Sequence, residues 1–494
     1  MTLNCLIITP PFSPNTSNPL LGPASLKSHV ENEGFELHCI DLNIVYINKF
    51  KDNNERRTNA VGDHDANEKQ IERARQHFAR SLCLPDIDSG RIPCCDDSNS
   101  SLPHSFDEID TALKSIIEEG FWVEFLENHI FSKNPQPSVL GISIMGPSQI
   151  PLALLLAALC KKFWHGTIII GGGSHITLLA SRISKDPRYA GSFDFFAPGH
   201  SEDVLAELVK RLSEKQSLNM KGLLPAGKNW IPGEGVPPEK RLAPTFEKEE
   251  LAYYQNGNLT LPVQLARGCA YGRCTYCTYP VVEEFERVPI DLMARKFISP
   301  MLKLSPHFIS VKDSLLTLTA MDTFGKVVHE LAPSLRWSAT TKVHSSMTPE
   351  FMRNLYNNGC RTLEMGIETI HPHSQKFFGK VESLANIEAA LDATLSAGIS
   401  VVINMIYGVM GETMEDAYKQ MFWWRSWKKR YPDYVFGVHN MLQIDEGSPL
   451  SRRPEQFGVK LNGCGPWSFT YVWNAPDWRP DFERYIKENG GRVQ

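Results

Sequence analysis

The chain has 494 residues, more than one ordinary hydrophobic core supports, so the sequence predicts two or three domains. Its formal net charge of −5 excludes the strongly basic surface that duplex nucleic acid or an anionic membrane attracts. Eleven cysteines without a basic, apolar leader argue against a disulfide framework and for metal or redox chemistry. We therefore expect a cytoplasmic protein with neither a nucleic-acid nor a membrane partner.

The first 215 residues alternate short apolar runs with helical stretches. Such alternation predicts a doubly wound, Rossmann-like parallel sheet that binds ligands at the carboxyl ends of its strands. In chain order the predicted elements are the strand Leu3–Thr9, the helix Ala24–Glu33, the strand Glu36–Ile40, the strand Val139–Ser143, the helix Ile150–Phe163, the strand Thr167–Ile170, the strand Phe193–Phe196 and the helix Glu202–Leu212.

Two segments break this alternation. The polar stretch at about 44–137 is interpreted as a helical insertion, with helices over Asn67–Ser81 and Phe106–Phe131, or else as partly disordered chain. Residues 216–260 are rich in Pro, Gly and Lys, which is typical of a linker between domains.

The alternation resumes over residues 261–450 and predicts a partial (β/α)6 barrel of the TIM type, with its chemistry on the loops that follow the strands. Residues 451–494 form a C-terminal extension whose tryptophans we expect to pack against the barrel. The predicted strands are Leu261–Leu265, Phe308–Val311, Arg336–Thr340, Thr362–Gly366, Val401–Tyr407 and Val435–Met441, and the predicted helices include Pro349–Asn357, Ala385–Ala397 and Met414–Lys428.

Three cysteines lie close together directly after the first predicted barrel strand. Cys269, Cys274 and Cys277 fall within nine residues, and soft thiolate ligands select zinc or iron–sulfur. A structural zinc ion needs four protein ligands, and no fourth Cys or His is nearby. Three ligands suit a [4Fe–4S] cluster with one open iron, so the cluster is favoured over zinc or over three metal-free cysteines.

This loop resembles that of the radical S-adenosylmethionine (SAM) superfamily. The family spaces its cysteines C-x3-C-x2-C, whereas this chain has C-x4-C-x2-C, and Gly272 offers the flexibility to absorb the extra residue. The resemblance implies that the open iron chelates SAM, which the cluster cleaves to a 5′-deoxyadenosyl radical.

Later segments follow in the order of the same family. Asp313 ends a segment that resembles the second barrel strand, and Met365–Thr369 resembles the G-I-E-S segment through Glu368. Ile406–Thr413 resembles the fifth-strand segment F-G-x-P-G-E-T that backs the adenine. The resemblance implies SAM contacts at Asp313, Glu368, Tyr407 and Gly408.

The motif order before residue 215 resembles the cobalamin-binding domain fused to many radical SAM enzymes. Glycines at the ends of parallel strands permit close approach of a flat macrocycle. The D-x-H-x-x-G signature of a lower cobalt ligand is absent, so His175 is interpreted as a loop anchor in preference to a cobalt ligand. A degenerate domain that binds no cobalamin is the alternative. The candidate contacts are Ser143, Gly172, Gly173, His175, Gly199 and Glu202.

The leading functional hypothesis is therefore a cobalamin-dependent radical SAM methyltransferase. It would act on an unactivated carbon of a small-molecule or peptide substrate, with an electron donor such as flavodoxin or ferredoxin. The alternatives are a radical rearrangement or cyclisation without methyl transfer, and a non-catalytic metal-binding or redox-sensor protein. No catalytic side chain is assigned by the sequence. A nucleotide-binding oxidoreductase is disfavoured because the G-x-G-x-x-G fingerprint does not follow the first strand.

Overall fold

The structure, a computed structural model, describes most of the chain as two compact units. The first unit is Met1–Leu259 with Cys464–Phe469, and the second is Thr260–Gly463 with Thr470–Gln494. Within these units the described residues are 3–11, 18–49, 114, 117–118, 120–183, 186, 191–225, 233, 235–254, 258–464, 468–488 and 492–493.

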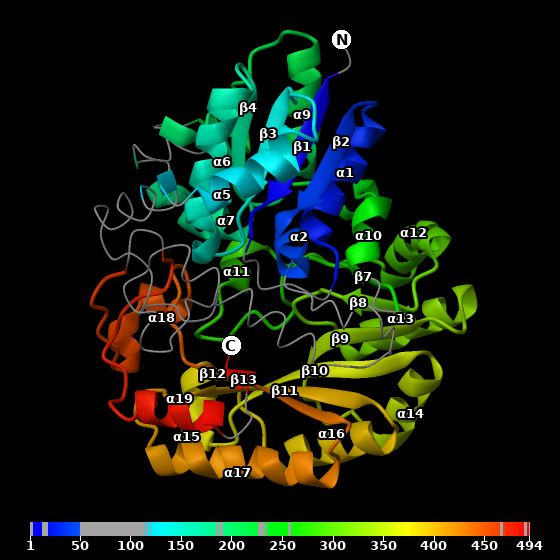
Figure 1. Cartoon of the computed structure of the whole chain (residues 1–494). Helices are drawn as coiled ribbons and strands as arrows, with labels where there is room; N and C mark the ends of the chain where they lie inside the picture. Colours follow the sequence, from blue (N-terminus) through cyan, green and yellow to red (C-terminus); the bar gives the residue numbers. More distant parts are fainter. Residues whose placement is uncertain are drawn as a thin grey trace. The chain divides into compact units, whose positions relative to one another are not determined.

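The first unit contains a six-stranded sheet in the order β2-β1-β3-β4-β5-β6 (Figure 1). All neighbours are parallel except β5 and β6, which are antiparallel. The doubly wound fold class predicted for this region is confirmed. The strands are β1 (Asn4–Thr9), β2 (Glu36–Asp41), β3 (Val139–Ser143), β4 (Ile168–Gly172), β5 (Phe195–Ala197) and β6 (Leu224–Pro225).

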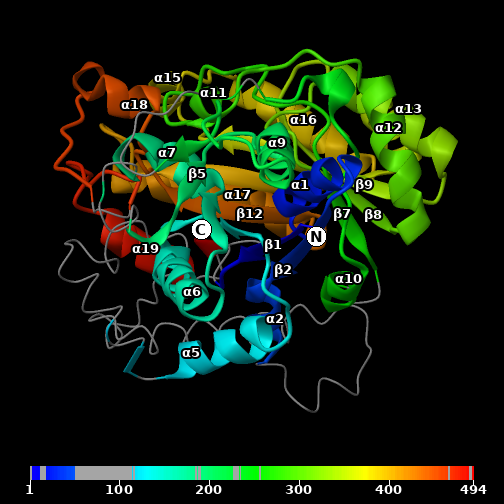
Figure 2. The ribbon, with the colours of Figure 1, turned by 90° about the horizontal axis from the view of Figure 1, so that it is seen from above.

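Helices cover both faces of this sheet, as the view from above shows (Figure 2). One apolar core lies under α2, α5, α6 and α7, and a second lies under α1 and α9. Two buried faces explain why β1, β3 and β4 are mainly apolar runs, whereas the edge strand β2 alternates exposed polar and buried residues. The helices are α1 (Leu21–Asn32), α2 (Leu42–Asn48), α5 (Phe121–Leu126), α6 (Ile150–Phe163), α7 (Ser174–Ile183), α9 (Glu202–Ser213) and α10 (Lys248–Tyr254), with a π-helical turn at Glu127–Phe131 and short 3-10 turns at Pro147–Gln149 and Pro238–Lys240.

The structure describes only part of the predicted insertion but most of the predicted linker. Of the insertion at about 44–137, the predicted helix Asn67–Ser81 lies outside the described residues, while the end of the predicted helix Phe106–Phe131 is helical. Residues 216–259, where the sequence predicts a linker, are part of the first unit and contain β6 and α10.

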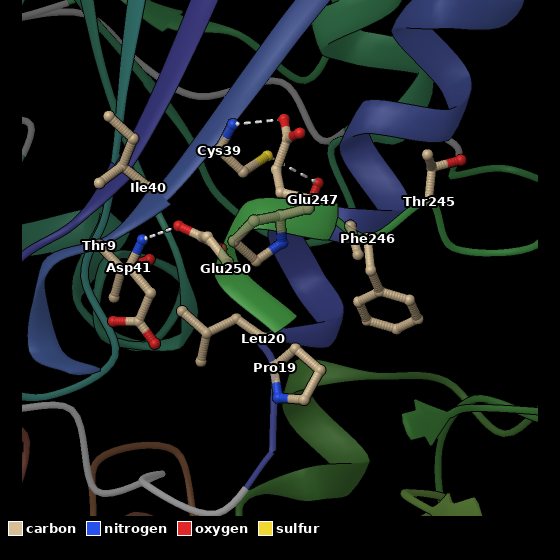
Figure 3. Close-up of a pocket in the computed structure, with 12 residues that line it drawn as sticks. Thr9, Pro19, Leu20, Cys39, Ile40, Asp41, Thr245, Phe246, Glu247 and Glu250 are labelled. Atoms are coloured by element: carbon tan, nitrogen blue, oxygen red, sulfur yellow. Dashed lines mark hydrogen bonds between the residues drawn. The ribbon is translucent and has the colours of Figure 1, made fainter. Parts of the chain in front are cut away.

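Helix α10 is held against the end of β2 by buried polar contacts (Figure 3). The backbone N–H of Asp41 donates to Glu250 Oε1 at 2.5 Å, and the Tyr254 hydroxyl donates to the carboxylate of Asp41. The backbone N–H of Cys39 donates to Glu247 Oε1 at 3.2 Å. Burial raises the pKa of Asp41 to about 6 and that of Glu250 to about 8. This packing joins α10 to the first sheet.

The second unit contains a seven-stranded, entirely parallel sheet in the order β13-β12-β11-β10-β9-β8-β7. The sequential order of β7 to β12 confirms the predicted partial barrel. The two-residue β13 was not predicted, because so short a strand leaves no periodic pattern. The strands are β7 (Thr260–Val263), β8 (Phe308–Val311), β9 (Arg336–Lys342), β10 (Cys360–Glu368), β11 (Ser400–Tyr407), β12 (Val435–Met441) and β13 (Arg492–Val493).

A helix follows each of the strands β7 to β12, and α14, α16 and α17 lie on one side of β9 to β12 (Figure 1). Capping side chains start several of them, as where Thr413 and Asp416 form a reciprocal capping box on α17. In the described ranges no helix combines the length and apolar character needed to cross a bilayer. The helices are α11 (Tyr279–Val282), α12 (Ile290–Met301), α13 (Leu318–Leu331), α14 (Pro349–Asn357), α15 (Pro372–Phe378), α16 (Leu384–Ser396), α17 (Met414–Arg430), α18 (Pro449–Arg452) and α19 (Arg479–Glu488), with 3-10 turns at Leu302–Leu304 and Pro454–Phe457.

Candidate functional site

The three cysteines lie on the loop that follows β7, between this strand and α11. Gly268 opens the loop with a φ of +70°, and a Cβ there would lie 2.5 Å from the backbone of Phe285, so only glycine fits. Cys269, Cys274 and Cys277 are all partly exposed. Of the other described cysteines, Cys464 is also partly exposed, whereas Cys5, Cys39, Cys160 and Cys360 are buried.

Hydrogen bonds from the segment after β10 hold this loop in place. The Tyr271 hydroxyl donates to the Gly379 carbonyl at 2.6 Å, and Thr275 Oγ1 donates to the Phe377 carbonyl at 2.8 Å. The Thr275 backbone N–H donates to the Phe378 carbonyl at 3.0 Å. The cysteine loop is thus fixed against the chain between α15 and α16.

Asp313 anchors the strand end from which the cysteine loop begins. Its two carboxylate oxygens accept backbone hydrogen bonds from Leu265 at 2.7 Å and Ala266 at 2.9 Å. The side chain is buried at the end of β8. The sequence assigns Asp313 to SAM, whereas its contacts in the structure support a role in positioning the loop.

Glu368 lies at the end of β10 in a buried ion pair. Its carboxylate accepts from Lys380 Nζ at 2.7 Å and from the Tyr276 hydroxyl at 2.9 Å, and the two charged side chains are 8% and 10% exposed. Glu368 also has a φ of +60°, a strained value for a residue other than glycine. Tyr276 belongs to the cysteine loop, so its hydrogen bond joins this ion pair to the loop that carries the thiols.

Gly366 leaves the space that this ion pair fills. A Cβ at this position would lie 2.6 Å from Lys380 Nζ and 2.7 Å from a carboxylate oxygen of Glu368. Any larger residue would displace both charged groups. The packing of the Glu368–Lys380 ion pair against Gly366 therefore explains why the predicted G-I-E segment has glycine at this position.

The surroundings of two of the three cysteine thiols shift their pKa values. Burial raises the pKa of Cys274 to about 11 and raises that of Cys277, while Lys380 acts in the opposite direction on both. Among the described residues no three His, Cys, Asp or Glu side chains converge as a site for a single metal ion. Ligands of a four-iron cluster bind different irons and need not converge on one atom.

The end of β11 is closed by its own turn and by the C-terminal extension. The backbone N–H groups of Gly408 and Val409 donate to Glu412, and Arg479 at the start of α19 packs on Gly408, where a Cβ would lie 2.7 Å from Arg479 Cδ. Tyr407 directs its hydroxyl to His439 Nδ1 at 2.9 Å, within the buried outer layer of the barrel. The Tyr407 carbonyl also accepts from the Leu442 backbone N–H at 2.8 Å, so this carbonyl and the Gly408 N–H are both already bonded within the protein.

The glycine-rich strand ends of the first unit surround one cavity of about 160 Å³. It lies between the sheet and helices α1 and α9, and five of the six contacts that the sequence assigns to cobalamin line it. These five are Ser143, Gly172, Gly173, Gly199 and Glu202.

His175, the sixth, does not line this cavity. It is fully buried at the start of α7, and its ring lies 5.8 Å from that of Phe469. Among the described residues neither ring nitrogen has a hydrogen-bond partner, and burial lowers its pKa to about 3. A neutral, enclosed imidazole packed among core side chains fits the interpretation of His175 as a structural anchor.

Comparison with known proteins assigns a family to the second unit. Residues 263–421 match the family model of the Radical SAM superfamily. This part of the chain is a radical SAM domain. A protein of Pyrococcus horikoshii named as an uncharacterized methyltransferase is 21% identical over 302 residues, which are 58% of this chain and 63% of that protein.

Solved structures extend the likeness beyond the radical SAM domain. The methyltransferase TsrM from Kitasatospora setae, with cobalamin and a [4Fe–4S] cluster bound, has a TM-score of 0.61 and 15% identity, covering 94% of this chain and 81% of TsrM. The cobalamin-dependent enzyme OxsB with aqua-cobalamin bound has a TM-score of 0.65 and 12% identity, covering 99% of this chain and 67% of OxsB. These likenesses establish a shared fold for both units.

The sequence did not identify two polar residues that complete the site of the radical SAM domain. Lys380 lies 12 positions after Glu368 and reaches it only because α15 folds back, so no local spacing signals the pair. Tyr276 lies between two of the cysteines, and its hydroxyl reaches Glu368, which is 92 positions later in the chain. The three cysteines and Glu368 are predicted from the sequence because short local segments carry them.

Proposed function

We propose that the chain is a cobalamin-dependent radical SAM methyltransferase that acts on a small molecule in the cytoplasm. The observation that carries this proposal is the accessible three-cysteine loop tied through Tyr276 to the Glu368–Lys380 ion pair. The loop and the ion pair lie at strand ends of the radical SAM domain. An external one-electron donor such as flavodoxin or ferredoxin would serve it.

The donor set of the loop fits a [4Fe–4S] cluster. Cys269, Cys274 and Cys277 would each bind one iron and leave the fourth open. When bound, the cluster would supply the electron that cleaves SAM, and cobalamin would supply the carrier for the methyl group. Asp313 would fix the strand end before the loop through its two backbone contacts. Gly268 would allow the close turn into the loop.

The Glu368–Lys380 pair matches the two polar groups of the methionine part of SAM. Glu368 would accept a hydrogen bond from the α-amino group, and Lys380 would donate one to the α-carboxylate, so these two contacts would replace the contact between Glu368 and Lys380. Tyr276 would keep Glu368 oriented while Lys380 turns to its new partner. Because both protein charges are already desolvated, the exchange avoids a second desolvation cost.

The cavity of the first unit supports the assignment of cobalamin. Gly173 has a φ of +100°, and a Cβ there would lie 2.3 Å from the Ile144 carbonyl oxygen, so the loop after β4 requires glycine. Gly172 differs, because a Cβ there would meet only the Ala197 carbonyl at 3.7 Å. The absence of side chains along this edge leaves backbone open to a flat ligand. His175 lies outside the cavity lining, which supports binding without a histidine on cobalt.

Substitution of Gly172 tests cobalamin binding. We expect hydroxocobalamin to copurify with or titrate into the wild type, and Gly172→Trp to lose at least tenfold in affinity without loss of iron. Gly191→Trp, at an exposed glycine with open space around it, is the matched control. Electron paramagnetic resonance of the Co(II) form should show no nitrogen splitting from an axial histidine, and His175→Ala should retain cobalamin. Failure of the wild type to bind any corrinoid would contradict methyl transfer through cobalamin.

A further inference from the structure

The inner face of the second unit's sheet is unusually polar for a barrel. Along β9 to β12, residues that face the helices are buried, whereas most alternate residues on the inner face are only partly buried. Of the inner-face residues, Phe436 is exposed and Gly366 is buried. Barrel interiors of the TIM type are normally filled by branched apolar side chains. The inner face here carries Ser338, Thr340, Lys342, Thr362, Glu364, Ser400, Asn404 and Asn440.

Glu364 is the carboxylate at mid-height on this face. Asn404 Nδ2 donates to its Oε1 at 2.7 Å, and Thr340 Oγ1 lies 3.5 Å from its Oε2. Thr340 is its register partner on β9, so the two side chains share the inner face. Both partners are neutral, and among the described residues no cation forms an ion pair with Glu364. A carboxylate accepts about four hydrogen bonds, so Glu364 keeps capacity for a charged ligand group.

Lys312 supplies a cation on the same face as this carboxylate. It directly follows β8, and Ser310 two positions earlier is paired with the inner-face residue Ser338. The Lys312 backbone N–H donates to the Val263 carbonyl at 2.7 Å, so the strand alternation continues past β8 and puts the exposed Lys312 side chain on the same face as Ser310. In the described part of the chain the Lys312 ammonium donates no hydrogen bond and forms no ion pair. The face therefore presents a carboxylate and an ammonium that do not neutralise each other by contact.

Aliphatic side chains border the charged groups. Val402 is the register partner of Glu364, and Val438 is that of Asn404, both on the inner face and both partly buried. The inner face thus carries opposite charges on β8 and β10 and apolar surface at Val402 on β11 and Val438 on β12. A ligand that matches them needs an ammonium, a carboxylate and an apolar body.

We propose that this inner face binds the substrate as a small α-amino-acid zwitterion with an apolar side chain. Its ammonium group is bound by Glu364 with Asn404 and Thr340, its carboxylate by Lys312, and its side chain by Val402 and Val438. The assignment rests on the proposed function. It makes this inner face, which leads to Gly366 beside the Glu368–Lys380 pair, the substrate side of the SAM site.

Ligand binding to the iron-loaded full-length protein tests this assignment. The probes are L-leucine, L-phenylalanine and L-tryptophan, each compared by NMR titration with its decarboxylated amine and its deaminated acid. We expect at least one amino acid to bind tenfold or more tightly than both of its single-charge analogues. Equal binding of all three members in every series would overturn the assignment.

Variants then assign the two charges separately. Glu364→Gln should weaken the amino acid at least tenfold and leave its deaminated acid unaffected. Lys312→Met should weaken the amino acid while leaving the decarboxylated amine unaffected. Lys326→Met, an exposed lysine on α13, should change none of these affinities. Unchanged amino-acid affinity in both inner-face variants would remove the site.

The same wild-type sample separates this assignment from the proposed function. Iron content and SAM cleavage without added amino acid report on the radical SAM chemistry alone. Cleavage of SAM with no preference for zwitterions would contradict only the substrate assignment. Preference for zwitterions in a protein that neither retains iron nor cleaves SAM would contradict only the proposed function.

Discussion

Glu368 has three unusual features. It has a left-handed backbone conformation, it is almost fully buried, and its charge is met by Lys380 and Tyr276. Strain of this kind costs on the order of 1–3 kcal/mol and persists where surrounding contacts over-determine it. The register of β10 against β11 also shifts between Gly366 and Glu368. These features turn the carboxylate toward the cysteine loop.

Removal of Lys380 tests its part in binding SAM. Lys380→Met should lower SAM affinity at least tenfold, since a charge-assisted hydrogen bond contributes about 1.5–3 kcal/mol. Decarboxylated SAM should lose much less, because it lacks the group that Lys380 would bind. Isothermal titration of iron-loaded protein measures both, with the exposed Lys376→Met as control. Equal losses for the two ligands would show that Lys380 acts only through Glu368.

Asp313 gives a second prediction at the scale of single residues. Asp313→Asn removes the charge that accepts from Leu265 and Ala266 and should destabilise the protein by about 2–4 kcal/mol. Because the loop begins at this strand end, the variant should also retain less iron after reconstitution. Thermal denaturation and iron analysis measure the two effects. Full iron retention with reduced SAM affinity would instead indicate that Asp313 contacts SAM.

At the scale of elements, the contact between α10 and β2 predicts a pH dependence. The raised pKa of Glu250, about 8 in the fold against an ordinary value of 4.5, means that the folded protein binds the proton more tightly than the unfolded chain. The free energy of unfolding should therefore fall as pH rises between about 4.5 and 8. One pKa unit corresponds to about 1.4 kcal/mol.

Glu250→Gln should remove the part of this pH dependence that comes from Glu250, because glutamine does not titrate and its amide oxygen still accepts from the Asp41 backbone N–H. The raised pKa of Asp41, about 6, leaves a smaller dependence below about pH 6. The variant should be more stable than the wild type at pH 8 by a few kcal/mol and nearly equal to it at pH 5. Tm measured across this range checks the difference. The exposed neighbour Glu249→Gln should follow the wild type throughout. A Glu250→Gln variant that loses stability equally at both pH values would rule out the buried acid as the cause.

Elements with a strong local pattern could be predicted, and those formed by distant pairing could not. The apolar runs of β1, β3 and β11 appear within about a residue of their predicted positions. Strand β5 begins at Phe195, two residues later than predicted, because Asp194 binds the start of β4 with its side chain and Phe193 packs into the core. Strands β6 and β13 have two residues each, and only their partners define them.

For the whole molecule, the order of motifs predicted both fold types, while the contacts among charged groups needed coordinates. The cysteine spacing and the glycine-bearing strand ends are local signals. The Glu368–Lys380, Asp313–Leu265 and Asn404–Glu364 contacts join residues 12 to 48 positions apart along the chain. Such pairs depend on which strands become neighbours, which a single sequence does not specify by spacing.

Anaerobic reconstitution with iron and sulfide tests the central claim, that three cysteines hold a cluster that cleaves SAM. The wild type should retain about four irons per chain and form 5′-deoxyadenosine or a methylated product from SAM. Cys269→Ala, Cys274→Ala and Cys277→Ala should each lose the visible absorbance of the cluster, whereas Cys360→Ala should keep it. Full iron and sulfide content in a Cys269→Ala variant, or zinc in place of iron in the wild type, would contradict the account.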